Sequence, residues 1–227
     1  MVSIIQSSLA DYRHELLLEN LVGIPILQQH GSADDNVPAF HSRRLSQLIS
    51  QHGNSSRYVE LPGKGHWFDG VMTTTYLRKY YHEVLAKGSM KPDLPGRFTI
   101  VIANPANHGS RGGIIVDQLV SPGQLGRLEV ERSSSLAWSC KTSNILRFHF
   151  STRCMEGVVP HTFHVDGCLL DVPPLSCLDE LWFLRSAKGS WKVGIPSNVV
   201  FVADLIRFRM TRGGDQYSNV MVLNWAP

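Results

Sequence analysis

Two side chains in the first third of the chain have the types and the setting of an acid and a base that act together. Asp34 lies in the run His30-Gly-Ser-Ala-Asp-Asp-Asn-Val-Pro38, and His66 ends the run Gly63-Lys-Gly-His66. Each run follows a short apolar segment and contains the glycine of a sharp turn. A carboxylate beside an imidazole holds the ring in one tautomer and stabilises its cation, so that the histidine can take a proton from a nucleophile. An aspartate or a histidine alone in such a loop is usually structural, but the two in this order favour an acid and a base.

The elements that must position these loops alternate between helix and strand. Apolar spacing predicts helices over residues 8–20, 38–52 and 71–86 and strands over residues 24–30 and 57–61. Such alternation favours a mostly parallel α/β sheet, with both loops at the same edge. Two parallel strands do not form an independent domain, because parallel sheets are normally buried on both faces. Residues 1–90 are therefore predicted to be the C-terminal part of an α/β-hydrolase fold, in which the acid precedes the histidine.

The chain changes character near residue 90, where the helical patterns stop. Short β-patterned runs between Gly, Pro and Ser residues predict an all-β, sandwich-like domain over residues 91–227. The predicted fold class is thus α/β followed by all-β. The predicted strands cover residues 97–104, 113–119, 126–132, 143–150, 161–165, 180–185, 191–193, 199–210 and 220–225.

The run HGSADDNVP, followed by a helix, a strand and GKGHWFDG, resembles the end of the prolyl oligopeptidase/dipeptidyl-peptidase family of serine peptidases. The resemblance covers roughly residues 10–87. It implies that Asp34, and not Asp35, is the triad acid, that His66 is the base, and that the substrate is a peptide or an ester. It implies no cofactor. The β-rich part after residue 92 does not correspond to the catalytic domain of that family and is predicted to be an additional module.

The nucleophile that such a pair serves has no counterpart in this sequence. The family places its serine in a G-x-S-x-G turn before the acid, and no such run occurs in the 227 residues. The run Gly109-Ser110-Arg-Gly-Gly113 lies after His66 and is predicted to be a turn. The chain is therefore either part of a longer gene product, which we favour, or an inactive remnant. We expect no peptidase activity from these residues alone.

Other functions were weighed against this one. The alternative, from another class, is a non-catalytic binding or interaction protein that acts through its β-rich domain. His161 and His164 would point to opposite faces of a strand, which disfavours a metal site. Four acidic residues nearby do not have the spacing of a calcium loop; they are Asp166, Asp171, Asp179 and Glu180. We therefore predict no metal and no cofactor.

The composition narrows the partners and leaves the compartment open. The formal net charge is only +3 and the basic residues are scattered, which disfavours nucleic acid as a partner. No apolar stretch is long enough to span a membrane, and the first residues do not resemble a signal peptide. The four cysteines contain no C-x-x-C pair and could form two disulfides or remain thiols; they are Cys140, Cys154, Cys168 and Cys177. The oligomeric state is not predicted.

Overall fold

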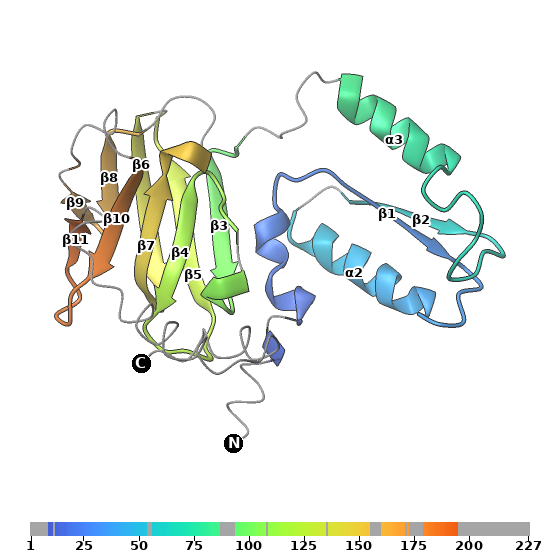
Figure 1. The fold of residues 1–227 in the computed structure, drawn as a ribbon, viewed down its shortest axis with the longest axis horizontal. Coiled ribbons are helices and arrows are strands. Elements are labelled where there is room, and N and C mark those ends of the chain that lie inside the picture. The colour runs from blue at the N-terminus through green and yellow to red at the C-terminus, as the bar shows by residue number, and fades with distance from the viewer. Residues whose placement is uncertain are drawn as a thin grey trace, which may run out of the picture. The chain divides into compact units, whose positions relative to one another are not determined.

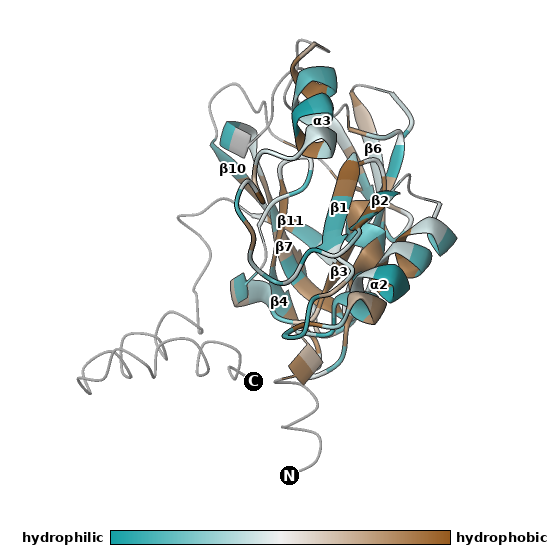
Figure 2. Ribbon diagram, turned by 90° about the vertical axis from the view of Figure 1, so that its right-hand side faces the viewer, coloured by the Kyte–Doolittle hydropathy of each residue, from teal (hydrophilic) through white to brown (hydrophobic). Residues whose placement is uncertain are grey.

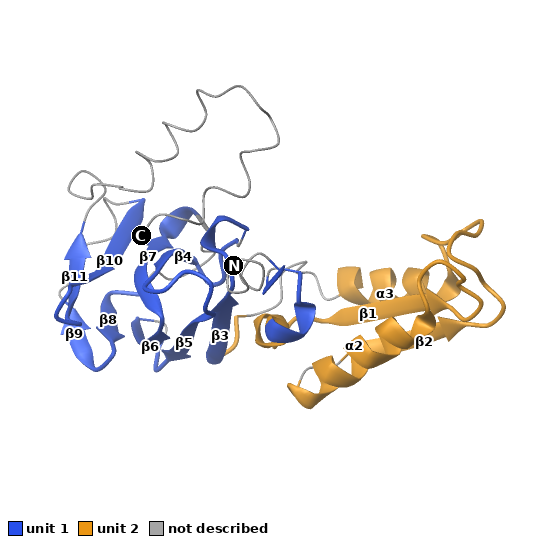
Figure 3. Ribbon diagram, turned by 90° about the horizontal axis from the view of Figure 1, so that it is seen from below, with its two compact units in different colours: residues 1–16, 96–227 blue, residues 17–95 orange. Residues whose placement is uncertain are grey.

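The chain forms two compact units, which are described separately. One comprises residues 17–95, and the other comprises residues 1–16 with 96–227 (Figure 3). The computed structural model describes residues 9–10, 12–53, 56–86, 94–107, 109–134, 136–154, 160–170, 172 and 179–194.

The smaller unit is built on a pair of parallel strands, β1 (Ile26–Gly31) and β2 (Ser56–Leu61). Between them the chain forms α2 (Ala39–Gln51), which contacts both strands and contains the buried Ile49. Figure 1 shows this helix beside the strand pair. The register places Gly31 opposite Leu61, so that the loops after β1 and β2 leave the sheet side by side. This register is what positions the candidate site.

Helix α3 (Thr75–Ala86) begins later than its apolar pattern predicts. The hydroxyl of Thr74 accepts a hydrogen bond from the N–H of Leu77, which is an N-cap contact, and donates one to Oε1 of Gln29 on β1. The cap therefore sets the helix start and also ties it to the strand. In Figure 2, α2 and α3 both carry hydrophilic and hydrophobic residues along their length.

Of the helix predicted over residues 8–20, only Leu9 and Ala10 are α-helical among the described residues. The chain instead makes short 3-10 turns, η1 (His14–Leu16) and η2 (Leu18–Leu21). Leu18 is buried and η2 contacts α2, so packing rather than local propensity decides the backbone here.

The larger unit contains two antiparallel-rich sheets that face each other. One has the order β11-β10-β7-β4 and the other the order β3-β5-β6-β8-β9, with β6 and β8 parallel (Figure 1). Short 3-10 turns, η3 (Pro105–Asn107) and η4 (Thr152–Cys154), follow β3 and β7. The strands are β3 (Arg97–Ile102), β4 (Ile114–Leu119), β5 (Gly126–Arg132), β6 (Ala137–Ser143), β7 (Ile145–Ser151), β8 (Thr162–Val165), β9 (Cys168–Leu170), β10 (Glu180–Arg185) and β11 (Trp191–Gly194).

Aromatic rings from both sheets form the core between them. The Trp138 ring of β6 lies 5.7 Å from the Phe150 ring of β7, and the Phe163 ring of β8 lies 4.9 Å from the Phe183 ring of β10. All four side chains are fully buried or nearly so. Edge-to-face and tilted pairs of this kind add to the free energy of area burial.

The predicted fold class is wrong. The described residues form three sheets of two, four and five strands and only two α-helices, so the chain is β-rich and not an α/β-hydrolase fold. In the described part of the chain, the alternation of helix and strand before residue 90 yields a single strand pair, whereas nine strands follow residue 96. Seven of the predicted β-runs overlap observed strands, and β6 and β9 were missed. The runs predicted over residues 199–210 and 220–225 lie outside the described residues.

Candidate functional site

Backbone hydrogen bonds join the loop after β1 to the loop after β2. The N–H of Ser32 donates to the carbonyl of Leu61 at 2.9 Å, and the N–H of Ala33 donates to that of Lys64 at 2.9 Å. The N–H of Gly63 donates to the hydroxyl of Ser32 at 2.8 Å. Two loops that are separated in sequence are thereby held side by side at the same end of the strand pair.

Gly31 permits this approach because it has no side chain. A Cβ atom at this position would lie 2.2 Å from the carbonyl oxygen of Lys64 and 2.6 Å from that of Gly65. Both neighbours are backbone atoms, so neither can rotate away as a flexible side chain would. The glycine after His30 in the motif is thus required for the loop that carries His66 to cross the end of β1.

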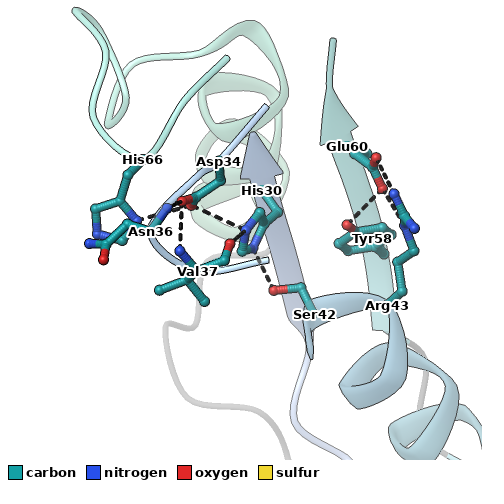
Figure 4. Close-up of polar contacts among 9 residues, drawn as sticks. All are labelled: His30, Asp34, Asn36, Val37, Ser42, Arg43, Tyr58, Glu60 and His66. Carbon is teal, nitrogen blue, oxygen red and sulfur yellow. Dashed lines mark hydrogen bonds and ion pairs between the residues drawn. The ribbon is translucent and has the colours of Figure 1, made fainter. Parts of the chain in front are cut away.

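Asp34 holds His66 at the edge formed by these loops. Oδ2 of Asp34 lies 2.9 Å from Nδ1 of His66, while Oδ1 accepts hydrogen bonds from the N–H groups of Asn36 at 3.0 Å and Val37 at 2.8 Å (Figure 4). The Asp34 side chain is 6% exposed and that of His66 is 30% exposed. The carboxylate is therefore enclosed, and the imidazole lies at the surface.

The surroundings keep Asp34 ionised. Burial is the largest single influence and acts to raise its pKa, but the N–H of Val37, the ring of His66 and the N–H of Asn36 together outweigh burial. The net effect holds the pKa of Asp34 below its ordinary value. An ionised Asp34 is an acceptor only, so Nδ1 of His66 carries the hydrogen of this bond.

That hydrogen bond leaves Nε2 as the basic nitrogen of a neutral His66 ring. Among the described residues no hydrogen-bond partner of Nε2 is found. Trp67 lies beside the ring in an edge-to-face arrangement, at 5.2 Å between ring centroids, and is 81% exposed. The arrangement is that of a general base with its orienting carboxylate.

A second histidine, His30, also contacts Asp34 and was missed by the sequence analysis. Its Nε2 lies 3.2 Å from Oδ2 of Asp34 and 2.8 Å from the carbonyl oxygen of Val37. Its Nδ1 lies 2.7 Å from the hydroxyl of Ser42 on α2 (Figure 4). The spacing of four residues across a glycine turn, His30 to Asp34, was the available signal.

Next to His30, an ion pair links the strand pair to α2. The guanidinium of Arg43 donates two hydrogen bonds of 2.7 Å to Glu60, and the hydroxyl of Tyr58 donates a third at 3.0 Å (Figure 4). Glu60 is the register partner of His30. The hydrogen bonds from Arg43, the largest influence, lower the pKa of Glu60 to about 2.

The larger unit contains another Asp–His pair in a different setting. Nδ1 of His149 lies 2.9 Å from Oδ2 of Asp117, and the His149 ring stacks on Trp182 at 4.3 Å. Burial, the main influence, raises the pKa of Asp117. Both side chains lie within strands and are mostly buried, so this pair is a packed part of a sheet rather than an exposed base.

The other residues considered as ligands do not come together. The carboxylate of Asp166 accepts hydrogen bonds from Thr142 and from Nε1 of Trp191, and Asp179 pairs with Arg153. In the part of the chain that the structure describes, no group of three His, Cys, Asp or Glu residues could hold a metal ion.

Gly109 and Ser110 are exposed and precede a tight turn between Arg111 and Ile114. Asp171 lies outside the described residues.

Two of the four cysteines can be described as thiols. Cys140 is a buried free thiol whose pKa burial raises to about 12, and Cys168 is an exposed free thiol. The Cys154 side chain and Cys177 lie outside the described part. None of the helices in the described ranges is long and apolar enough to cross a membrane.

Comparison with known proteins gives one relative. The chain is 39% identical over 186 residues to a protein of Arthroderma benhamiae described as an uncharacterized secreted protein. The match covers 81% of this chain but 20% of the relative, so the chain spans about a fifth of that protein's length. No protein-family model matches the chain. No solved structure matches it either.

Proposed function

We propose that this chain supplies the acid and the base of a serine-type peptidase or hydrolase site of the prolyl oligopeptidase type. One observation carries the proposal, namely the 2.9 Å contact between Oδ2 of Asp34 and Nδ1 of His66 at a loop edge. Both Oδ1 hydrogen bonds of Asp34 come from the backbone, so the carboxylate has a fixed orientation. A fixed carboxylate and a partly exposed imidazole are what general-base activation of a hydroxyl requires.

The proposed reaction moves one proton through His66. Nε2 takes the proton of a serine hydroxyl as the serine oxygen attacks the carbonyl carbon of a peptide or an ester. The same nitrogen then gives the proton to the leaving amine or alcohol as the tetrahedral intermediate collapses. Asp34 remains ionised and stabilises the imidazolium, which agrees with its lowered pKa.

The serine would come from another part of a longer parent protein, because no G-x-S-x-G run occurs in this sequence. The Arthroderma benhamiae relative, which is much longer than this chain, supports a longer parent. Its description as secreted supports the same location for the parent protein. On this proposal the 227 residues alone have no turnover, because a base without its nucleophile leaves the reaction almost uncatalysed.

The test uses the complete gene product, identified by reading the genomic sequence upstream of Met1 for an in-frame G-x-S-x-G. Hydrolysis of a fluorogenic dipeptide substrate is measured for the wild type, Asp34→Asn and His66→Gln. We expect kcat/KM to fall by about 10⁴-fold in both variants. Asp35→Asn is the matched control, because Asp35 is exposed beside Asp34, and it should keep wild-type turnover.

Two results would contradict the proposal. One is wild-type turnover in the Asp34→Asn variant of the complete protein. The other is hydrolysis by the purified 227-residue chain above that of its own Asp34→Ala control, since that would place the nucleophile within this sequence.

A further inference from the structure

His30 lies between the Asp34 loop and helix α2, with its side chain 10% exposed. It contacts three groups, two in the loop after β1 and one on α2. These are the Asp34 carboxylate, the carbonyl of Val37 and the hydroxyl of Ser42. The ring is therefore held on one side by the loop after β1 and on the other by α2.

The partners of His30 determine which nitrogen carries its hydrogen. The carbonyl of Val37 only accepts, so Nε2, at 2.8 Å from it, is an N–H donor. The hydroxyl of Ser42 can donate to a bare Nδ1 or accept from a protonated one. In either state the Nε2–H group donates to the carbonyl of Val37, and Oδ2 of Asp34 lies 3.2 Å from the same nitrogen, at ion-pair distance.

The contact with His30 adds a second ring nitrogen beside Oδ2 of Asp34, and the carbonyl that His30 binds belongs to Val37, whose N–H donates to Oδ1. Oδ1 accepts from two backbone N–H groups, and Oδ2 faces the ring nitrogens of His66 at 2.9 Å and His30 at 3.2 Å. Three hydrogen bonds and the ion-pair contact with His30 thus hold the carboxylate through both of its oxygens. Rotation of the carboxylate away from His66 would therefore break contacts on both oxygens.

We propose that His30 is a positioning residue that orients the Asp34 carboxylate toward His66. Its ring is itself held to α2 by Ser42, so that the helix fixes the direction in which the Nε2–H points. This inference rests on the proposed function, in which His66 acts as the base. It adds a residue that touches neither the substrate nor the reacting atoms.

The consequence for His66 is a fixed tautomer. When Asp34 is oriented, the neutral His66 ring keeps its hydrogen on Nδ1, because that nitrogen donates to Oδ2. When Asp34 is free to rotate, nothing holds the hydrogen there, and the ring exchanges between its two neutral forms. A merely structural role of His30 would not change this equilibrium in a folded variant.

The experiment is nitrogen-15 NMR of the imidazole side chains in the full chain at a pH where His66 is neutral. In the wild type we expect two well-separated His66 signals, a pyrrole-type Nδ1 and a pyridine-type Nε2. In His30→Phe, which keeps a ring of similar size, the two signals should move toward each other. His30→Gln carries an amide N–H near the position of Nε2 and should restore the separation.

Two further variants serve as references. His52→Phe makes the same replacement at an exposed histidine at the end of α2, and should leave the His66 signals unchanged. Asp34→Asn should move the hydrogen of His66 from Nδ1 to Nε2, because an amide in place of the carboxylate favours the wrong tautomer. The Asp34→Asn spectrum gives the size of the change in the His66 signals when the contact with the Asp34 carboxylate is lost, and the His52→Phe spectrum gives the change expected from a distant substitution.

Unchanged His66 signals in a folded His30→Phe variant would overturn the proposal. If His30→Phe does not fold, Ser42→Ala replaces it, since that variant keeps the ring and removes only its anchor on α2. Convergence of the two signals in Ser42→Ala supports the proposal, and unchanged signals refute it. If Asp34→Asn also leaves His66 unchanged, the Asp34–His66 pair itself fails, which is a separate result that removes the basis of the proposed function.

In the complete protein, His30→Phe should lower kcat by about 10- to 100-fold with little change in KM, which is part of the roughly 10²- to 10⁴-fold that general acid–base catalysis contributes. The NMR result does not depend on turnover. A parent protein without hydrolase activity would refute the proposed function and leave the positioning of Asp34 by His30 to be judged on the His66 signals alone.

Discussion

At the scale of single residues, the surroundings of Asp34 explain why one of two adjacent aspartates is suited to hold a histidine. Asp34 is enclosed by two loops and meets N–H donors on both of its oxygens, whereas Asp35 is exposed. The sequence favoured Asp34 through its place in the motif, and the structure brings Asp34 and His66 into contact. The catalytic role of the pair stays a prediction until turnover is measured.

Gly31 offers a test of how the loops are held. In Gly31→Ala, the added methyl group would lie within 2.6 Å of two carbonyl oxygens, so the loop before His66 must move. We expect the free energy of unfolding of residues 17–95 to fall by about 1–3 kcal/mol, the usual cost of overpacking. Urea unfolding followed by NMR signals of this unit measures the change.

Gly65→Ala is the matched control for that substitution. A Cβ atom at Gly65 would have only an ordinary contact, at 3.9 Å from the carbonyl oxygen of Ala33. We expect it to be tolerated with the contact between Asp34 and His66 intact. Equal stability of the two variants would show that the close approach at Gly31 does not constrain the loop.

His30 marks the limit of the residue-level prediction. The motif spacing shows that a histidine precedes Asp34 by four residues, but it does not show where the ring points. Its contact with Ser42 depends on the distance between β1 and α2, which only packing decides.

At the scale of elements, the ion pair between Arg43 and Glu60 links α2 to β2. Hydrogen bonds from Arg43 and Tyr58 lower the pKa of Glu60 from an ordinary 4.5 to about 2. Between these values the unfolded chain takes up a proton that the folded chain does not. Stability from this group is therefore present above about pH 4.5 and is lost as the pH falls toward about 2.

The corresponding prediction compares Glu60→Gln with the wild type. The wild-type unit of residues 17–95 should lose stability more steeply between pH 4.5 and about 2 than the variant, which lacks the titrating group. Urea midpoints of the NMR signals of this unit at several pH values measure the two slopes. Arg43→Gln should flatten the slope in the same direction, and parallel slopes in all three proteins would rule out this linkage.

Element prediction succeeded where pattern and packing agree. Helix α2 and strands β1 and β2 form where their apolar spacing predicts them, although Phe40 of the α2 stripe is exposed and Ile49 is buried. The helix predicted over residues 8–20 is wrong from His14 onward, where 3-10 turns form and Leu18 is buried in one of them. Strand β6, with the sequence AWSCKTS, was missed because small and polar residues separate its two buried side chains, Trp138 and Cys140.

At the scale of the whole molecule, the aromatic cluster holds the two larger sheets together. Phe163 is fully buried and its ring contacts the rings of Trp138, Phe150 and Phe183. Phe163→Ala removes these contacts and leaves a cavity, and we expect a loss of about 3–5 kcal/mol in the free energy of unfolding. Chemical unfolding followed by the fluorescence of Trp138 and its neighbours measures this loss.

Leu169→Ala is the control in the same sheet. Leu169 lies on β9 and is 62% exposed, so its truncation removes little buried area. We expect a change of less than about 0.5 kcal/mol, as for most surface substitutions. A comparable loss in both variants would mean that the cluster around Phe163 is not the stabilising core of this unit.

The sequence by itself determined which residues form the candidate site and where most of the local elements lie. It marked Asp34 and His66 as partners, placed both in loops at strand ends, and marked most strands of the second half by their alternation. These features depend on the residue types within short runs of the chain, and such runs can be recognised without knowledge of the tertiary contacts. Only the tertiary structure decided the rest. The fold is β-rich because nine strands of the described residues after Gly96 pair into two sheets, and pairing between distant segments leaves no short-range pattern. His30 joins Asp34 because three segments of the chain converge on one carboxylate, and that convergence is a property of packing.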